Sequence, residues 1–170
     1  AGNYEIDPHH TYPSFEGDHM GLSVWRGKFK RSAGRVVYDK ASGLGSVDVS
    51  VQTDSIDFGH DVLNGWARGA SFLDSAQWAI ARYRGQIEPA SGTQPARVVG
   101  ELEIRGIVRP LVLTLHGIKC LTHPLTRREV CGADASGRFR RDEFGLGFGK
   151  EMGFGMDVTL RIQAEAFAVD

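Results

Sequence analysis

Apolar and polar residues alternate strictly along long stretches of this chain. Side chains of a β-strand point to opposite faces in turn, so a period of two predicts a strand with one dry and one wet face. The longest such run has an apolar set of Met156, Val158, Leu160, Ile162, Ala164 and Ala166. The same alternation places on single faces Val47, Val49 and Val51, Leu102 and Ile104, and Leu111, Leu113 and Leu115.

Further strands are predicted at residues 14–20, 22–31, 34–39, 77–88 and 130–141, with turn sequences such as residues 41–43 and 90–92 between strands. Eight or nine strands with one apolar face each enclose one core, which a closed barrel and a two-sheet sandwich both provide. The strands between residues 97 and 161 are long and lack the short, regular spacing of a sandwich. We therefore predict an all-β fold, an antiparallel eight-stranded barrel, in a single domain spanning residues 1–170.

One segment, from His60 to Gln77, interrupts the alternation. Val62, Leu63 and Trp66 follow helical spacing instead, and Gly65 and Gly69 are predicted to break the segment. We expect one or two short helices near residues 60–76, lying across or beside a mouth of the barrel.

The charge of the chain is balanced, with 20 basic and 21 acidic residues and a formal net charge of -1. A nucleic-acid-binding protein would show a basic patch or a high isoelectric point, so nucleic acid is not an expected partner. No apolar run approaches the roughly 18 residues of a spanning helix. The chain opens at Ala1 without an initiator Met, which suits a mature exported chain after signal removal, or one trimmed at the same point for expression.

Two cysteines, Cys120 and Cys131, flank a polar stretch that contains Pro124. If this stretch is the loop of a hairpin, a disulfide can cross-link its two strands and contribute about 3 kcal/mol in the chain-entropy model. Two buried free thiols are the alternative. A metal site is not predicted, because neither cysteine belongs to a CxxC pair.

The predicted interior favours a ligand. Eight strands leave a space that side chains fill or that holds one small molecule. Phe15, Gly17 and His19 share one strand face, and small residues beside aromatic ones leave a tube with apolar walls. Such walls stabilise a hydrocarbon by about 25 cal/mol per Å² buried. The alternative is that Gly17 only marks a bend in the strand.

Several segments then resemble the motifs of a known family. These are residues 4–10 with Phe15 and 19–21, residues 26–29 with Gly34, residues 55–59, residues 68–74, residues 100–106 with 109–110, and residues 141–145. In this order and with almost ungapped spacing, they resemble the YceI-like family. The resemblance implies a lipocalin-like barrel, exported to the bacterial periplasm or secreted, that binds a polyisoprenoid lipid.

The resemblance also implies an apolar channel around the isoprenoid chain. We expect the ligand to contact Phe15, His19, Trp25, Phe29, Ile56, Phe72, Trp78, Ile80, Leu102, Ile104, Leu113, Met156 and Val158, with Phe148 at a mouth and Arg68 facing a pyrophosphate. Ordinary core packing is the alternative for each apolar residue, and pairing with Asp74 is the alternative for Arg68. The chain departs from the family pattern at Phe58, Asn64, Trp66 and Ala79, so the mouth is expected to differ.

The predicted function is therefore binding, storage or transport of a long-chain polyisoprenoid of the prenyl quinone or polyprenyl phosphate type, without catalysis and without a cofactor. Besides the lipid, a second copy of the chain in a homodimer and a membrane-associated donor or acceptor protein are partners to consider. One alternative is an enzyme that uses His10 or His19 as its acid or base. Another is a scaffold barrel whose surface binds a protein partner, which a large exposed apolar patch would favour.

Overall fold

The computed structural model describes residues 2–169 and is built almost entirely from β-strands. One short α-helix, α1 (Asp61–Arg68), and three 3₁₀ turns, η1 (Thr53–Ser55), η2 (Arg141–Phe144) and η3 (Lys150–Met152), interrupt them. The strands are β1 (Gly2–Ile6), β2 (Tyr12–His19), β3 (Ser23–Phe29), β4 (Ser32–Tyr38), β5 (Gly45–Gln52), β6 (Ile56–Asp57), β7 (Ile80–Glu88), β8 (Arg97–Ile104), β9 (Ile107–Thr122), β10 (Glu129–Arg140) and β11 (Asp157–Val169).

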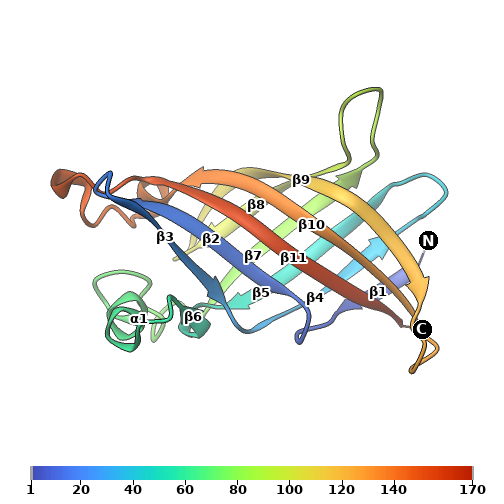
Figure 1. Cartoon of the computed structure of the whole chain (residues 1–170), viewed down its shortest axis with the longest axis horizontal. Helices are drawn as coiled ribbons and strands as arrows, with labels where there is room; N and C mark the ends of the chain where they lie inside the picture. Colours follow the sequence, from blue (N-terminus) through green and yellow to red (C-terminus); the bar gives the residue numbers. More distant parts are fainter. Residues whose placement is uncertain (1, 170) are drawn as a thin grey trace.

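Eight of these strands close into an antiparallel barrel (Figure 1). The order around the ring is β1-β4-β5-β7-β8-β9-β10-β11, and pairing of β1 with β11 closes it. The three remaining strands lengthen the barrel at one end. β2 continues the line of β1 along β11, β3 leads into β4 and pairs with β2, and β6 follows β5 and pairs with β3. The predicted eight-stranded barrel is confirmed.

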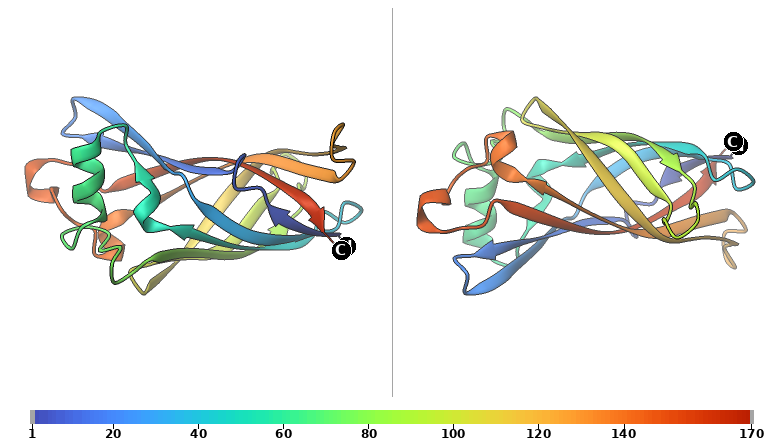
Figure 2. Two further views of the ribbon diagram at one scale, coloured as in Figure 1. Left: turned by 90° about the horizontal axis from the view of Figure 1, so that it is seen from below. Right: turned by 90° about the horizontal axis from the view of Figure 1, so that it is seen from above.

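The helix lies at the end of the barrel opposite the two chain termini (Figure 2). We call this the helix end and the other the terminal end. His60 caps α1, since its ring Nδ1 accepts a hydrogen bond from the Leu63 amide at 3.1 Å. The predicted break at Gly65 is wrong: α1 passes through it, because one glycine costs a helix only about 1 kcal/mol. The helix ends at Arg68, with Gly69 as its C-cap, as the second predicted break implies.

Alternation sets the interior of the barrel as predicted. At the helix end, the buried residues Ile56, Ala67, Leu73, Ile104, Phe144 and Leu146 form one packed group, which we call the helix-end cluster. A second buried group lies in the middle of the barrel and consists of Tyr83, Ile87, Val98, Leu111, Leu113 and Ala135. Within residues 2–169, no helix is long and apolar enough to cross a membrane.

A disulfide joins Cys120 and Cys131, as the hairpin interpretation predicted. These two residues face each other directly in the pairing of β9 with β10, with their Cα atoms 4.1 Å apart. The bond therefore closes the hairpin at the terminal end of the barrel, and the alternative of two free thiols is excluded.

Candidate functional site: an apolar cavity inside the barrel

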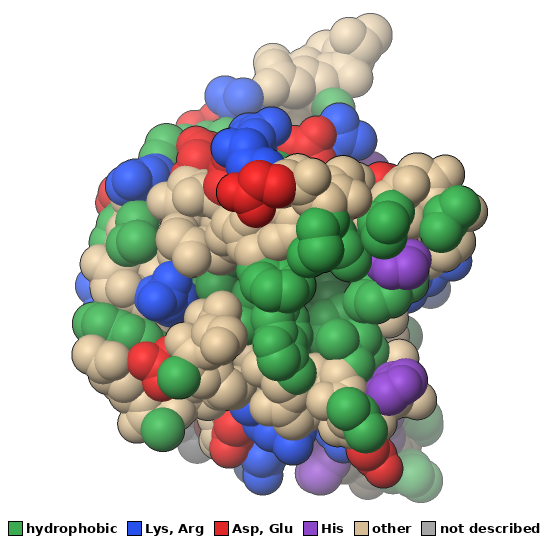
Figure 3. All heavy atoms as spheres, turned by 90° about the vertical axis from the view of Figure 1, so that its left-hand side faces the viewer, with side chains coloured by type: hydrophobic (Ala, Val, Ile, Leu, Met, Phe, Trp, Pro, Cys, Tyr) green, Lys and Arg blue, Asp and Glu red, His purple; other side chains and the backbone are tan. Residues whose placement is uncertain are grey.

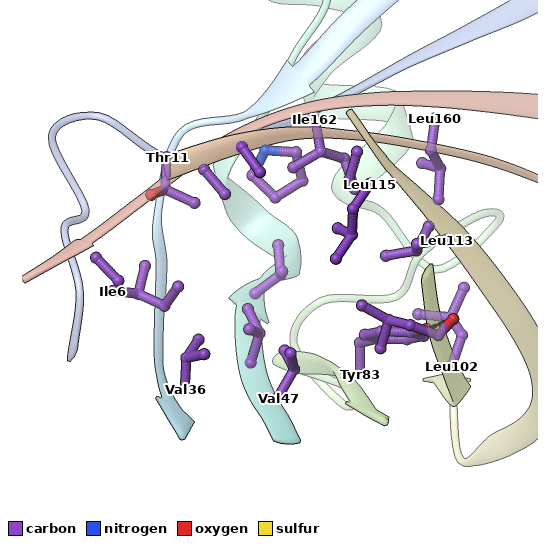
Figure 4. A pocket seen from close by; sticks show the side chains of 18 of the residues that line it. Ile6, Thr11, Val36, Val47, Tyr83, Leu102, Leu113, Leu115, Leu160 and Ile162 are labelled. Atoms are coloured by element: carbon purple, nitrogen blue, oxygen red, sulfur yellow. Dashed lines mark hydrogen bonds between the residues drawn. The ribbon is translucent and has the colours of Figure 1, made fainter. Parts of the chain in front are cut away.

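A cavity of about 250 Å³ runs through the barrel interior (Figure 4). Its wall is formed by the inward faces of all eight ring strands, and side chains from opposite strands point toward one another. The members that Figure 4 labels are Ile6, Thr11, Val36, Val47, Tyr83, Leu102, Leu113, Leu115, Leu160 and Ile162. Nearly every side chain in the wall is apolar, so the cavity suits a hydrocarbon.

Small residues on β10 and β11 create the space. Ala133 pairs directly with Ala164, and Cys131 pairs with Ala166. All four line the cavity. A barrel of eight strands filled by bulky aliphatic residues would be solid. Because β10 and β11 carry small side chains at these inward positions, the interior beside them is not filled and the cavity stays open.

The side chain of Tyr83 lies along the cavity wall in the middle of the barrel. Its hydroxyl donates to the backbone carbonyl of Leu111 at 2.8 Å, and its ring lies over Gly100. A Cβ atom at Gly100 would lie 2.8 Å from that ring, so only glycine lets the phenol lie flat against the wall. Burial raises the pKa of Tyr83 well above its ordinary value, which keeps the hydroxyl neutral.

Polar contacts close the terminal end of the cavity. Tyr4 is 3% exposed and lines the cavity, and its hydroxyl donates to the carboxylate of Glu129. The ammonium group of Lys40 binds the same carboxylate. Burial raises the pKa of Tyr4 to about 12, and the negative charge of Glu129 acts in the same direction.

This arrangement predicts a loss of stability in alkali. An unfolded tyrosine ionises near pH 10, whereas folded Tyr4 stays neutral up to about pH 12. Stability is thus fully present below pH 10 and falls as the pH rises from about 10 to 12. Urea unfolding between pH 9 and 12 should show this fall, and Tyr4→Phe should make it shallower, most clearly when combined with Tyr83→Phe. Identical pH profiles for the wild type and both variants would contradict the assignment.

A second hollow, of about 690 Å³, lies at the helix end between β3 and α1. Trp25, Phe58 and Trp66 line it together with Val24, Arg26, His60, Val62 and Leu63. In Figure 3 hydrophobic side chains gather around a hollow at the centre of this end.

Two of the residues that depart from the family pattern shape this end. The amide of Asn64 accepts from the Phe58 backbone N–H at 2.7 Å and donates to Asp57 at 2.9 Å, which fixes α1 to β6. Trp66 packs against Phe72 and Phe148.

The structure places the predicted ligand contacts in four groups. Phe29, Leu102, Ile104 and Leu113 line the cavity. Ile56 belongs to the helix-end cluster, and Phe15 and Phe72 pack against it. Buried Met156, just before β11, and half-buried Val158, on β11, precede the lining residue Leu160 and do not line the cavity themselves. The fourth group lies outside the cavity and comprises His19, Trp25, Arg68, Trp78, Ile80 and Phe148.

Members of this last group have other contacts. The ring of His19 stacks on Trp25, with centroids 4.0 Å apart. Arg68 is exposed on α1, and Phe148 is 49% exposed on the loop between η2 and η3. The expectation that Ile80 faces inward is not met, since its side chain is 45% exposed while its neighbour Ala81 lines the cavity.

Sequence reasoning left out much of the wall. The residues it missed include Tyr4, Val36, Tyr38, Ile87, Val98, Ile118, Ala133 and Ala135. It had placed Val47, Val49, Val51, Leu115, Leu160, Ile162, Ala164 and Ala166 on apolar faces without assigning them to the channel. The signal was therefore present in the alternation itself.

The histidines considered as an acid or base have no catalytic arrangement around them. His10 bonds the carboxylate of Asp7 at 2.8 Å on the surface, with 61% of its side chain exposed. Neither His10 nor His19 lines the cavity. Among residues 2–169, no three His, Cys, Asp or Glu side chains are placed to hold a metal ion.

A closed antiparallel barrel with a helix at one mouth and an apolar interior cavity defines a lipocalin-like binding protein. The model of the YceI-like domain matches residues 4–166, and the chain belongs to the YceI-like family. Among curated relatives, a UPF0312 protein of Vibrio cholerae is 27% identical over 168 residues, which cover 97% of this chain and 87% of the relative. A UPF0312 protein of a Shewanella species is 29% identical over 121 residues, 69% of this chain and 63% of the relative.

Solved structures share the fold. BcnA of Burkholderia cenocepacia superimposes with a TM-score of 0.77 at 20% identity, covering 94% of this chain and 98% of that one. A polyisoprenoid-binding domain from Saccharophagus degradans, implicated in plant cell wall breakdown, gives a TM-score of 0.70 at 14% identity, covering 99% and 100%.

Proposed function

We propose that this protein binds a long-chain polyisoprenoid lipid inside the barrel, for storage or transport, and acts in the periplasm or outside the cell. The apolar cavity carries the proposal, because its wall offers a hydrocarbon a dry environment worth about 25 cal/mol per Å² buried. The fold shared with the polyisoprenoid-binding domain from Saccharophagus degradans supports it, and the disulfide supports an oxidising location.

The cavity volume of about 250 Å³ lies just below the roughly 300–1,000 Å³ typical of small-molecule sites. A few isoprene units fill such a space, so a longer chain would continue past the cavity toward one end. The terminal end is closed by Tyr4, Glu129 and Lys40. We therefore place the exit of the chain at the helix end, where the hollow seen in Figure 3 lies.

Native mass spectrometry of the protein purified from a bacterial host tests the proposal, followed by organic extraction and identification of what is released. We expect one prenyl lipid per chain. A protein that stays at its bare mass, and remains so when offered prenyl lipids, would refute the proposal.

We also propose that the helix end is where the lipid is exchanged with a membrane-associated donor or acceptor. Three neighbouring segments at this end expose large apolar side chains, namely the β2–β3 turn, α1 and the η2–η3 loop (Figure 1). Leu22 is 77% and Val62 78% exposed, and Met20, Val24, Trp25, Phe148 and Met152 accompany them. Such clustering of exposed apolar side chains is typical of a contact surface.

The double substitution Leu22→Ser with Val62→Ser should slow uptake of a fluorescent prenyl lipid from phosphatidylcholine vesicles several-fold, because it removes the most exposed apolar side chains of this end. The equilibrium affinity should change much less than the uptake rate, since neither residue lines the cavity and Val62 only borders the hollow at the helix end. Leu44→Ser with Leu125→Ser, at exposed turns of the terminal end, is the matched control. Equal uptake rates for the two double variants would contradict the assignment.

A further inference from the structure

The wall of the cavity has no charged side chain directed into it. Within the part of the chain that the structure describes, no Lys, Arg, His or Asp lines the cavity, and Glu165 is the single charged residue in contact with it. Glu165 stands between Ala164 and Ala166, whose side chains face inward, so alternation turns its carboxylate to the outer face. A phosphate drawn into this space would lose its hydration without meeting a cation, at a large cost in free energy.

Three hydroxyl groups in the wall, those of Thr11, Thr53 and Tyr83, are already engaged, and the phenol of Tyr38 is the remaining single neutral donor beside Tyr4. Thr11 donates to the backbone carbonyl of Glu165 and accepts from its amide, each at 3.1 Å. The hydroxyl of Thr53 lies 2.8 Å from the carbonyl of Trp78, and Tyr83 donates to Leu111. A phosphate needs several strong donors at once, and none of these three hydroxyls has its proton free. Burying an uncharged hydroxyl or carbonyl oxygen costs much less free energy than burying a phosphate.

Three cations near the helix end, Arg140, Arg141 and Lys150, already have partners. A fourth, Arg105, donates to the backbone carbonyl of Gly145 at 2.9 Å; its Nε is buried without a partner among the described residues, but the side chain does not line the cavity. Asp142 binds both Arg140, at 2.8 Å, and Lys150, at 2.9 Å. The guanidinium of Arg141 donates to the backbone carbonyls of Gly155 and Leu146. Using any of these side chains to grip a phosphate would therefore break existing bonds.

The start of α1 is also unsuited to an anion. The His60 ring occupies the Leu63 amide, and Asp61 adds a negative charge in the first turn. Arg68 stays exposed on the last turn, away from the cavity wall. Arg26, the cation that lines the helix-end hollow, already faces the carboxylate of Glu16 at 3.6 Å, so neither of these exposed cations offers a phosphate a site built for it.

From these observations we infer that the protein selects prenyl lipids with an uncharged head group, such as a prenyl alcohol or a prenyl quinone, over prenyl phosphates and diphosphates. The inference rests on the proposed lipid-binding function and narrows the class of ligand within it. A neutral lipid can draw its head group into the cavity together with the isoprene units next to it. A diphosphate must hold its head in water and leave the adjoining carbons unburied.

The test compares two ligands of equal chain length, geranylgeraniol and geranylgeranyl diphosphate, each delivered from cyclodextrin and titrated by calorimetry. We expect the alcohol to bind about tenfold more tightly, since the difference corresponds to burying about two more carbons at about 0.8 kcal/mol per CH₂. Ala164→Phe, which fills the cavity, should abolish binding of both. Gln163→Phe, on the outer face of the same strand, should retain both affinities and the preference.

The outcomes separate the inference from the function beneath it. Equal or tighter binding of the diphosphate, weakened by salt, would overturn the inference while leaving lipid binding intact. Preference for the alcohol that persists in Ala164→Phe would also overturn it, because the selectivity would then come from another site. Binding of neither ligand by the wild type would refute the proposed function itself.

Discussion

Ala164→Phe is expected to weaken binding of a prenyl lipid by at least about 100-fold, equivalent to roughly 2.7 kcal/mol. Ala164 and its cross-strand partner Ala133 line the cavity where the wall recedes. A phenyl ring added there occupies the middle of a cavity of only about 250 Å³, so the hydrocarbon can no longer pass along it. Displacement of a stoichiometric fluorescent prenyl probe measures the loss directly.

The protein should still fold with Phe at position 164, because the ring enters empty space and not a filled core. We expect its free energy of unfolding to stay within about 1 kcal/mol of the wild-type value. Gln163→Phe adds the same ring one residue away on the exposed face of β11 and should leave affinity unchanged. Wild-type affinity in Ala164→Phe would show that the lipid binds outside the barrel.

The fold was predictable from sequence because each long strand carries its own signal. Leu111, Leu113 and Leu115 alternate with polar or outward residues, and all three line the interior. The run that ends at Ala166 behaves in the same way. A period of two determines which face is buried without knowledge of the neighbouring strand. The breaks that separate β1 from β2 and β5 from β6 carry no such signal in the sequence. Where each strand ends there depends on its pairing with strands that are distant in sequence.

The cavity was harder to predict than the barrel, because empty space depends on which residues meet across strands. Ala133 and Ala164 are unremarkable in sequence and make room only because the register of β10 and β11 sets them side by side. Gly17, which the sequence suggested as a residue that widens the channel, does not line the cavity.

The error at Ile80 has a specific cause. Tyr83 and Ile87 face inward on β7, which turns every even-numbered position of that strand outward. Ile80 takes the outward phase although it is large and apolar, and Trp78 lies before the strand begins. The hydrophobic character of Ile80 therefore gave the wrong direction for its side chain. Which positions of β7 face inward is determined by the residues that follow.

Replacement of both cysteines, Cys120→Ser with Cys131→Ser, is expected to lower the free energy of unfolding by about 3 kcal/mol. The disulfide spans 11 positions and joins directly paired residues of β9 and β10. Its loss frees the unfolded hairpin to sample many more conformations, whereas the paired strands hold the folded state. Urea unfolding at neutral pH measures the change, and the reductant dithiothreitol provides an independent route to the same state.

Reductant should destabilise the wild type by a similar amount and leave the double variant unchanged, which separates the cross-link from the two serine substitutions.

Cys131 also lines the cavity beside Ala166, so the double variant replaces apolar sulfur with a hydroxyl in the wall. If it lost lipid affinity while the reduced wild type kept it, the cause would be that hydroxyl and not the loosened hairpin. If both lost affinity equally, the cross-link would be holding the terminal end of the cavity in shape. Equal free energies of unfolding for the oxidised wild type and the double variant would contradict the prediction, because the disulfide would then contribute no stability.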